Sequence, residues 1–161
     1  MTARAAAALL GSAALALSGC GSSGPPPSLA ARTSSWVAAN GIGPAIGTLE
    51  ADDARIAADV TAGEYGNLHA DCALLDSDLS TVASSPTSPD ETLSQDMTAA
   101  FSDEAAAGRD CFGGSAANQA VLARSRTERI QAQANLESAL ARIGTLTGRV
   151  PSTATTVPGG G

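Results

Sequence analysis

Apolar residues recur at alternating intervals of three and four along much of the chain, which places them on one face of an α-helix. The clearest run has no polar interruption and belongs to a helix expected over about 66–83, starting at the residue before it: Tyr65, Leu68, Cys72, Leu75, Leu79 and Val82. Polar residues of this segment fall off that face, and we expect them to be solvated: His69, Asp71, Asp76 and Asp78. The pattern predicts a helix that presents Cys72 to a partner helix.

The segment 44–61 has the same spacing with one polar interruption. Its face consists of Ile42, Ile46, Leu49, Asp53, Ile56 and Val60. We expect Asp53 at the edge of this face, widened by a neighbouring alanine, with a functional buried acid as the alternative. A shorter helix over 28–40 contains Trp36. It is expected to end or kink near Gly41-Ile42-Gly43-Pro44, because glycine and proline interrupt the pattern there.

A fourth helix is predicted after the turn at Pro86-Thr87-Ser88-Pro89. Ser88 is the expected N-cap, with Pro89 at the first helical position and Glu91 completing a capping box. The apolar face is expected to carry Leu93, Met97, Phe101, Gly108 and Cys111 or Phe112. Gly113-Gly114 would end this helix.

A fifth helix is predicted over 116–143. Its apolar positions are Val121, Leu122, Ile130, Leu136, Leu140 and Ile143. Its arginines are Arg124, Arg126, Arg129 and Arg142. We expect the arginines to face water or the acidic segments 50–59 and 71–78. The fold class is therefore all-α: a small antiparallel bundle of four to five helices over 28–146, followed by a disordered tail over 147–161.

The first nineteen residues have the features of an export signal. Arg4 supplies a positive charge, and an apolar run from Ala5 to Leu17 follows. This run is shorter than the roughly 20 apolar residues that span a bilayer. A buried alanine-rich helix of the folded domain is the alternative.

Leu17-Ser18-Gly19-Cys20 closes the signal and resembles the bacterial lipobox. The resemblance implies that residues 1–19 are removed and that lipid is attached to the Cys20 thiol. The protein would then be anchored on the outer face of the cell membrane; secretion without an anchor is the alternative. Residues 20–27, rich in Gly, Ser and Pro, would form a flexible tether.

Two further cysteines, Cys72 and Cys111, would enter a disulfide-permissive compartment after export. With Cys20 acylated, they have only each other as an intramolecular partner. Their midpoint lies just past the turn before the fourth helix, so two antiparallel helices would bring them to similar heights. A disulfide closing this loop would stabilise the fold by roughly 4 kcal/mol. A metal site with His69 and Asp71, and free thiols, are the alternatives.

Several of these features together resemble small predicted lipoproteins and secreted proteins of actinobacteria. They are Trp36, the motif Cys72-Ala73-Leu74-Leu75, the turn Pro86-x-x-Pro89-Asp90 with Leu93 after it, and Cys111, within residues 34–113. The resemblance implies an exported, disulfide-linked, helical protein. It implies no activity.

Charge and composition further limit the classes of function that the sequence allows. Sixteen acidic residues against nine basic ones give a net charge of −7, which argues against a nucleic-acid binder. A single histidine removes most general-base schemes. The adjacent pairs Asp52-Asp53 and Asp103-Glu104 point to different parts of a helix surface and are expected to be solvated. We therefore expect no catalytic residue, no metal and no cofactor.

The resulting hypothesis is a membrane-anchored, non-enzymatic helical module of the cell envelope that binds a protein partner. Exposed apolar surface on the fifth helix would favour it. The alternative is a carrier of a small apolar ligand between helices, which a cavity of several hundred cubic ångströms would favour. A remote alternative is an enzyme that uses His69 with nearby carboxylates.

Overall fold

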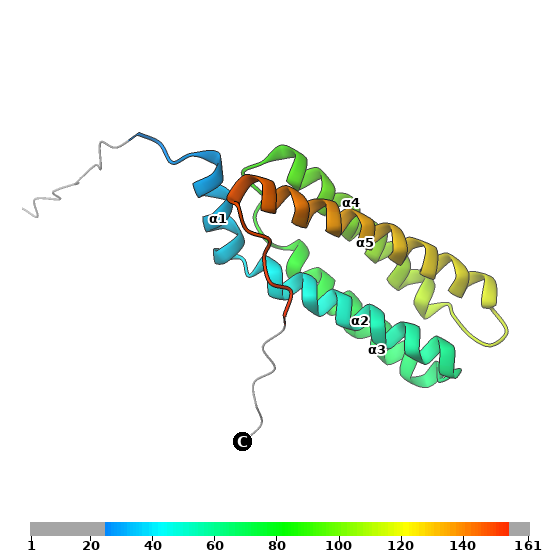
Figure 1. The fold of residues 1–161 in the computed structure, drawn as a ribbon. Coiled ribbons are helices and arrows are strands. Elements are labelled where there is room, and N and C mark those ends of the chain that lie inside the picture. Colours follow the sequence, from blue (N-terminus) through cyan, green and yellow to red (C-terminus); the bar gives the residue numbers. More distant parts are fainter. Residues whose placement is uncertain (1–24, 155–161) are drawn as a thin grey trace, which may run out of the picture.

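The computed structural model describes residues 25–154 as an all-α fold, as the sequence predicts. The helices are α1 (Leu29–Ala39), α2 (Ile42–Ala62), α3 (Tyr65–Ala83), α4 (Glu91–Phe112) and α5 (Gln119–Thr147). The four long helices α2 to α5 run alternately in opposite directions, and α1 lies at one end of the bundle (Figure 1). The signal segment, Cys20 and residues 155–161 lie outside the described residues.

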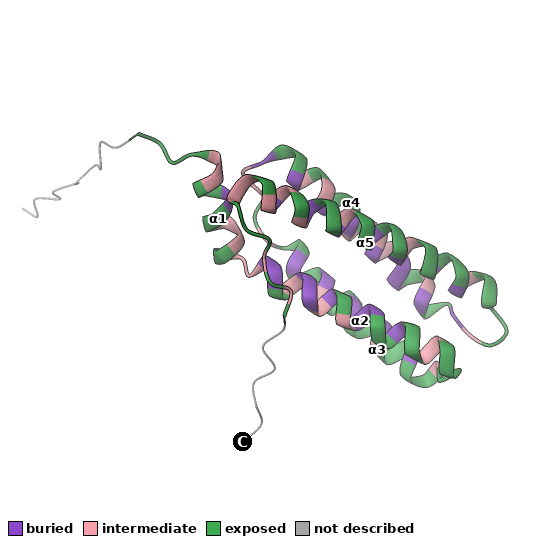
Figure 2. Cartoon of the chain, in the orientation of Figure 1, coloured by how far each residue is buried: buried purple, intermediate pink, exposed green. Residues whose placement is uncertain are grey.

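A seven-residue repeat explains why these helices form a bundle. The buried positions of α4 are spaced by three or four through most of its length: Leu93, Met97, Ala100, Glu104, Ala107 and Cys111. Those of α5 follow the same rule: Leu122, Ser125, Arg129, Ala132, Leu136, Ala139 and Ile143. Such a spacing keeps one seam of each helix against its neighbours, as in antiparallel four-helix bundles. Figure 2 shows these buried positions on the inward sides of the helices.

The apolar core consists of two clusters. The first lies mainly between α2 and α3 and reaches Cys111 and Leu122, with Leu49, Ile56, Leu68 and Leu75 fully enclosed. The second joins the beginning of α2 and of α4 to the last part of α5, and contains Ile42, Ile46, Leu93, Leu136 and Ile143. On both α4 and α5, charged residues separate the positions that belong to the two clusters.

Cys72 of α3 and Cys111 of α4 form a disulfide, which confirms the predicted pair. Their Cα atoms are 6.0 Å apart, within the usual range for a disulfide. Both residues are buried. The disulfide excludes the alternatives of a metal site through these sulfurs and of free thiols.

Contacts between distant segments fix the end of the bundle that carries α1. Gly41 has a φ of 56°, so it turns the chain between α1 and α2 in a conformation that favours glycine. Trp36 donates its indole N–H to the carbonyl oxygen of Pro86, at 2.7 Å, and so ties α1 to the turn between α3 and α4.

Residues 148–154, here called the C-terminal strap, leave α5 and pass across the first turns of α2. Gly43 and Gly47 face the strap, and a methyl group on either would overlap with the carbonyl oxygen of Ser152 or Thr153. The two glycines therefore permit a close backbone approach. The predicted tail begins at residue 147, and its first residues are part of the packed domain.

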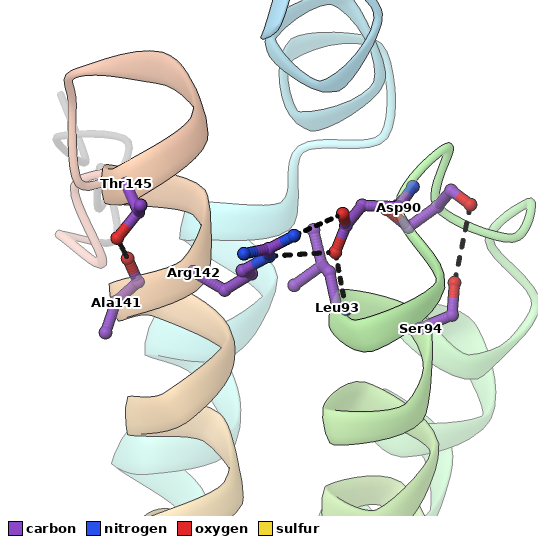
Figure 3. A network of polar contacts seen from close by, with 7 residues as sticks. Asp90, Leu93, Ser94, Ala141, Arg142 and Thr145 are labelled. Carbon is purple, nitrogen blue, oxygen red and sulfur yellow. Dashed lines mark hydrogen bonds and ion pairs between the residues drawn. The ribbon is translucent and has the colours of Figure 1, made fainter. Parts of the chain in front are cut away.

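The start of α4 differs from the prediction. The N-cap is Asp90 instead of Ser88: the Asp90 carboxylate accepts from the backbone N–H of Leu93 at 2.9 Å. The same carboxylate accepts two hydrogen bonds from Arg142 of α5, at 3.0 and 2.8 Å (Figure 3). This ion pair favours Asp90 as the cap. A local capping pattern cannot reveal it, because Arg142 is distant in sequence. Both interactions lower the pKa of Asp90, the Arg142 hydrogen bonds most strongly.

Candidate functional site

Three charged side chains from three helices lie buried midway along the bundle. Asp53 of α2, Glu104 of α4 and Arg129 of α5 are 5%, 1% and 8% exposed, and we call them the polar layer. The Oδ1 atom of Asp53 lies 3.8 Å from Nε of Arg129. The expectation that Asp53 lies at the edge of the helix face was wrong. The seven-residue repeat places it inside, where an arginine offsets its charge.

Burial governs the protonation of the polar layer. Burial and, to a smaller extent, the neighbouring Asp53 carboxyl group together raise the pKa of Glu104 from 4.5 to about 8. Burial also raises the pKa of Asp53 from 3.8 to about 6, against the opposing effect of Arg129. At pH 7 Glu104 therefore keeps its proton, whereas Asp53 is ionised and faces the positive charge of Arg129. The layer is then electrically neutral.

The neighbouring Asp52 is also buried, but it points toward α3. It pairs with Arg55, whose Nε lies 3.4 Å from Oδ1 of Asp71. Burial, together with Asp78, raises the pKa of Asp52 to about 6, while Arg55 opposes the shift. Asp52 and Asp53 do point to different parts of the helix surface, as predicted.

The expectation that the two acidic pairs are solvated was wrong for Asp52, Asp53 and Glu104. On the buried face of α4, Glu104 lies between two small residues, Ala100 and Ala107. In the second pair, only Asp103 stays partly exposed, where it accepts from the Asn135 amide at 2.9 Å.

The arginines of α5 have different partners. Arg129 pairs with α2, which confirms the prediction that an arginine faces the acidic segment 50–59. Arg124 instead pairs with Asp110 of α4 at 2.8 Å. The assignment of Ile130 to the apolar face was wrong, because Arg129 occupies the buried position and Ile130 is 58% exposed.

A cleft of about 590 Å³ opens between α2 and α5. Ala57, Val60 and Thr61 form its α2 wall. The α5 wall consists of Gln119, Leu122, Ala123, Arg126, Thr127 and Arg129. Since Arg126 is exposed and Arg129 is buried, the cleft runs from a positively charged rim to the edge of the polar layer. No carboxyl, imidazole or thiol group belongs to these lining residues.

A second cavity of about 530 Å³ lies at the opposite end of the bundle. Val37 and Ala38 of α1, Ile143 and Thr147 of α5, and Val150 of the C-terminal strap contribute to its walls. Arg149 is its charged lining residue. It differs from the first cleft in having no buried charged group among its lining residues, so a substitution in it provides a matched control.

His69 makes its hydrogen bond outside the polar layer. Its Nε2 donates to the carbonyl oxygen of Gly114 at 3.1 Å, which links α3 to the loop before α5. Within residues 25–154, no three His, Cys, Asp or Glu side chains are arranged to hold a metal ion. None of the described helices has both the length and the hydropathy of a membrane-spanning segment.

Comparison of the chain with protein-family models, with curated proteins and with solved structures found no match. The fold and the site therefore define the class: an antiparallel helical bundle with a disulfide, a buried carboxyl–guanidinium layer and a cleft beside it.

Proposed function

We propose that this protein is a lipid-anchored protein of the cell envelope that binds a small, largely apolar ligand in the cleft between α2 and α5. The cleft carries the proposal. Its volume of about 590 Å³ falls in the range of small-molecule sites, roughly 300–1,000 Å³. This was the observation expected to favour a carrier over a module that binds a protein.

The lining of the cleft supports binding in preference to catalysis. Val60 and Leu122 supply apolar surface from facing helices, and small alanines leave room beside them. Arginine, threonine and glutamine can orient a bound molecule through hydrogen bonds. None of these side chains ordinarily acts as a general base or a nucleophile at neutral pH.

Filling the cleft tests this function. Ala123 is exposed on the α5 wall, so Ala123→Phe would occupy the cleft without disturbing the core. The matched control is Ala38→Phe, which fills the second cavity. Titration calorimetry with decanol should show binding to the parent chain and to the control, and at least a tenfold loss in Ala123→Phe. Equal binding by all three proteins would contradict the assignment of the cleft.

The envelope location rests on the lipobox-like sequence that ends at Cys20. Metabolic labelling with an alkyne fatty acid should mark the wild-type protein and leave Cys20→Ala unlabelled. The labelled protein should sediment with membranes. Release of an unlabelled mature protein into the medium would favour the secreted alternative.

A protein partner is the second candidate function. Ile130 favours it, because this large apolar side chain is 58% exposed on α5. Among the described residues of α5 it is the one exposed large apolar side chain, and so it supports this function less strongly than the cleft supports ligand binding. Ile130→Ser should abolish co-purification of an envelope partner if this candidate is correct, and should leave decanol binding unchanged.

A further inference from the structure

We propose that the ligand of the α2–α5 cleft is a single-chain amphiphile with one anionic head group, which pairs with Arg129 and Arg126. The inference rests on the proposed function and adds the chemical class of the ligand. It starts from the part of the polar layer that borders the cleft: Nη1 of Arg129 is buried and has no hydrogen-bond partner among the described residues, and the carboxyl oxygens of Asp53 and Glu104 have none either. A buried guanidinium donor without a partner is costly, and an anion would satisfy it.

The charges around Arg129 leave room for an anion. From α2 it faces Asp53, whose nearest oxygen is at 3.8 Å, longer than a hydrogen bond. From α4 it faces Glu104, whose raised pKa keeps it uncharged at neutral pH. The charge of Arg129 is therefore offset by one carboxylate that lies beyond hydrogen-bond distance, and its Nη1 donates to neither acid.

Arg126 makes the rim of the cleft positive. It lines the same cleft, and no ion pair joins it to an acidic side chain in the described part of the chain. The two guanidinium groups are near enough for Arg126 to act against the protonation of Arg129. In a chain with an excess of acidic residues, this pair attracts an anionic head group and repels a cationic one.

The rest of the cleft suits an apolar tail. Val60 and Leu122 line it from opposite helices, and Ala57 and Ala123 keep it open. A carboxylate and a phosphate monoester would both satisfy the arginines, since each presents several acceptor oxygens. A fatty acid and a lysophospholipid-like phosphate are therefore two sources of the same chemistry.

Calorimetry with four ten-carbon probes tests the inference. The protein is the full chain carrying Cys20→Ala, so that neither lipid nor detergent competes for the cleft. Decanoate, decyl phosphate, decanol and decyltrimethylammonium are titrated at neutral pH below their micelle concentrations. At least one anion should bind about tenfold more tightly than decanol, and the cation should bind most weakly. The preferred anion identifies the carboxylate or the phosphate source.

Variants locate the head group. Arg126→Gln should weaken binding of the preferred anion about fivefold and leave decanol binding unchanged. Arg129→Gln should weaken it further. Arg124→Gln is the control, because Arg124 lies on the same helix but pairs with Asp110. Since Arg129→Gln can fail to fold, the probe series and Arg126→Gln decide the result.

The outcomes separate the two proposals. Equal affinity for decanol and for both anions would overturn the anionic head group and leave the apolar-ligand function standing. Binding of no probe would overturn both. If Arg126→Gln and Arg124→Gln weaken anion binding equally, the placement of the head group in the cleft would be overturned.

Discussion

The substitution Glu104→Gln gives the sharpest check on the polar layer. It replaces a buried acid, which holds its proton at pH 7, with a neutral amide of similar shape. Burial raises the pKa of Glu104 from 4.5 to about 8, so the native state binds a proton that the unfolded state has released. A carboxyl group whose pKa is raised on folding loses stability as the pH rises toward the native value. We therefore expect the wild-type protein to become less stable between pH 6 and pH 9.

The magnitude follows from the same shift. Two pKa units separate pH 6 from the native value of about 8, and each unit corresponds to about 1.4 kcal/mol, so the wild-type protein should lose about 3 kcal/mol over this range. The variant has no such group. Asp52 and Asp53, with pKa values of about 6, are already about half ionised at pH 6, so the variant should lose about 1 kcal/mol or less above that pH.

Urea denaturation at a series of pH values measures this difference. For a urea slope of about 2 kcal/mol per molar, the wild-type midpoint should fall by roughly 1.5 M between pH 6 and pH 9. Glu137→Gln, an exposed substitution on α5, should retain the wild-type pH dependence. If Glu104→Gln and the wild-type protein lose stability in parallel, Glu104 is not the buried proton carrier described above.

Three other changes test the rest of the fold. Replacing Cys72 and Cys111 with serine should lower the free energy of unfolding by about 4 kcal/mol, and an unchanged urea midpoint after reduction would contradict this. Gly47→Ala should displace the C-terminal strap, cost about 1–3 kcal/mol and expose the strap to limited proteolysis. Its control, Gly66→Ala in open space on α3, should instead stabilise by about 1 kcal/mol in thermal unfolding. Asp90→Ala removes the cap of α4 and leaves its arginine partner unpaired, so a loss of about 2 kcal/mol is expected in urea denaturation, and a loss below the error of the measurement would refute its role.

Periodicity in the sequence was sufficient to predict the helical class, the order of the helices and the disulfide. These features depend on apolar residues that repeat at helical spacing and on two cysteines that lie on either side of a turn, with their midpoint just past it. The first cluster of the core shows why this prediction succeeded. No polar residue interrupts the apolar spacing of Leu68, Cys72, Leu75 and Leu79, and all four are buried.

The polar layer could not be predicted by sorting residues by polarity. Leu122, Leu136 and Ile143 are separated by multiples of seven, and the same register passes through Arg129. That register was the available signal, and choosing Ile130 for its hydrophobicity missed it. The partners of Arg129 lie on α2 and α4, so no local pattern connects them. The same reason explains the N-cap, where an arginine distant in sequence holds Asp90.

The position of α1 has a consequence for how the molecule would stand on a surface. Residue 25 leads into α1, and the C-terminal strap ends beside the first turns of α2, so both described ends lie at one pole of the bundle (Figure 1). The cleft lies toward the other pole, where α2 ends and α5 begins; α2 itself is about 30 Å long. A lipid on Cys20 would therefore connect the bilayer to the pole that carries α1, and the entrance of the cleft would lie at the opposite pole.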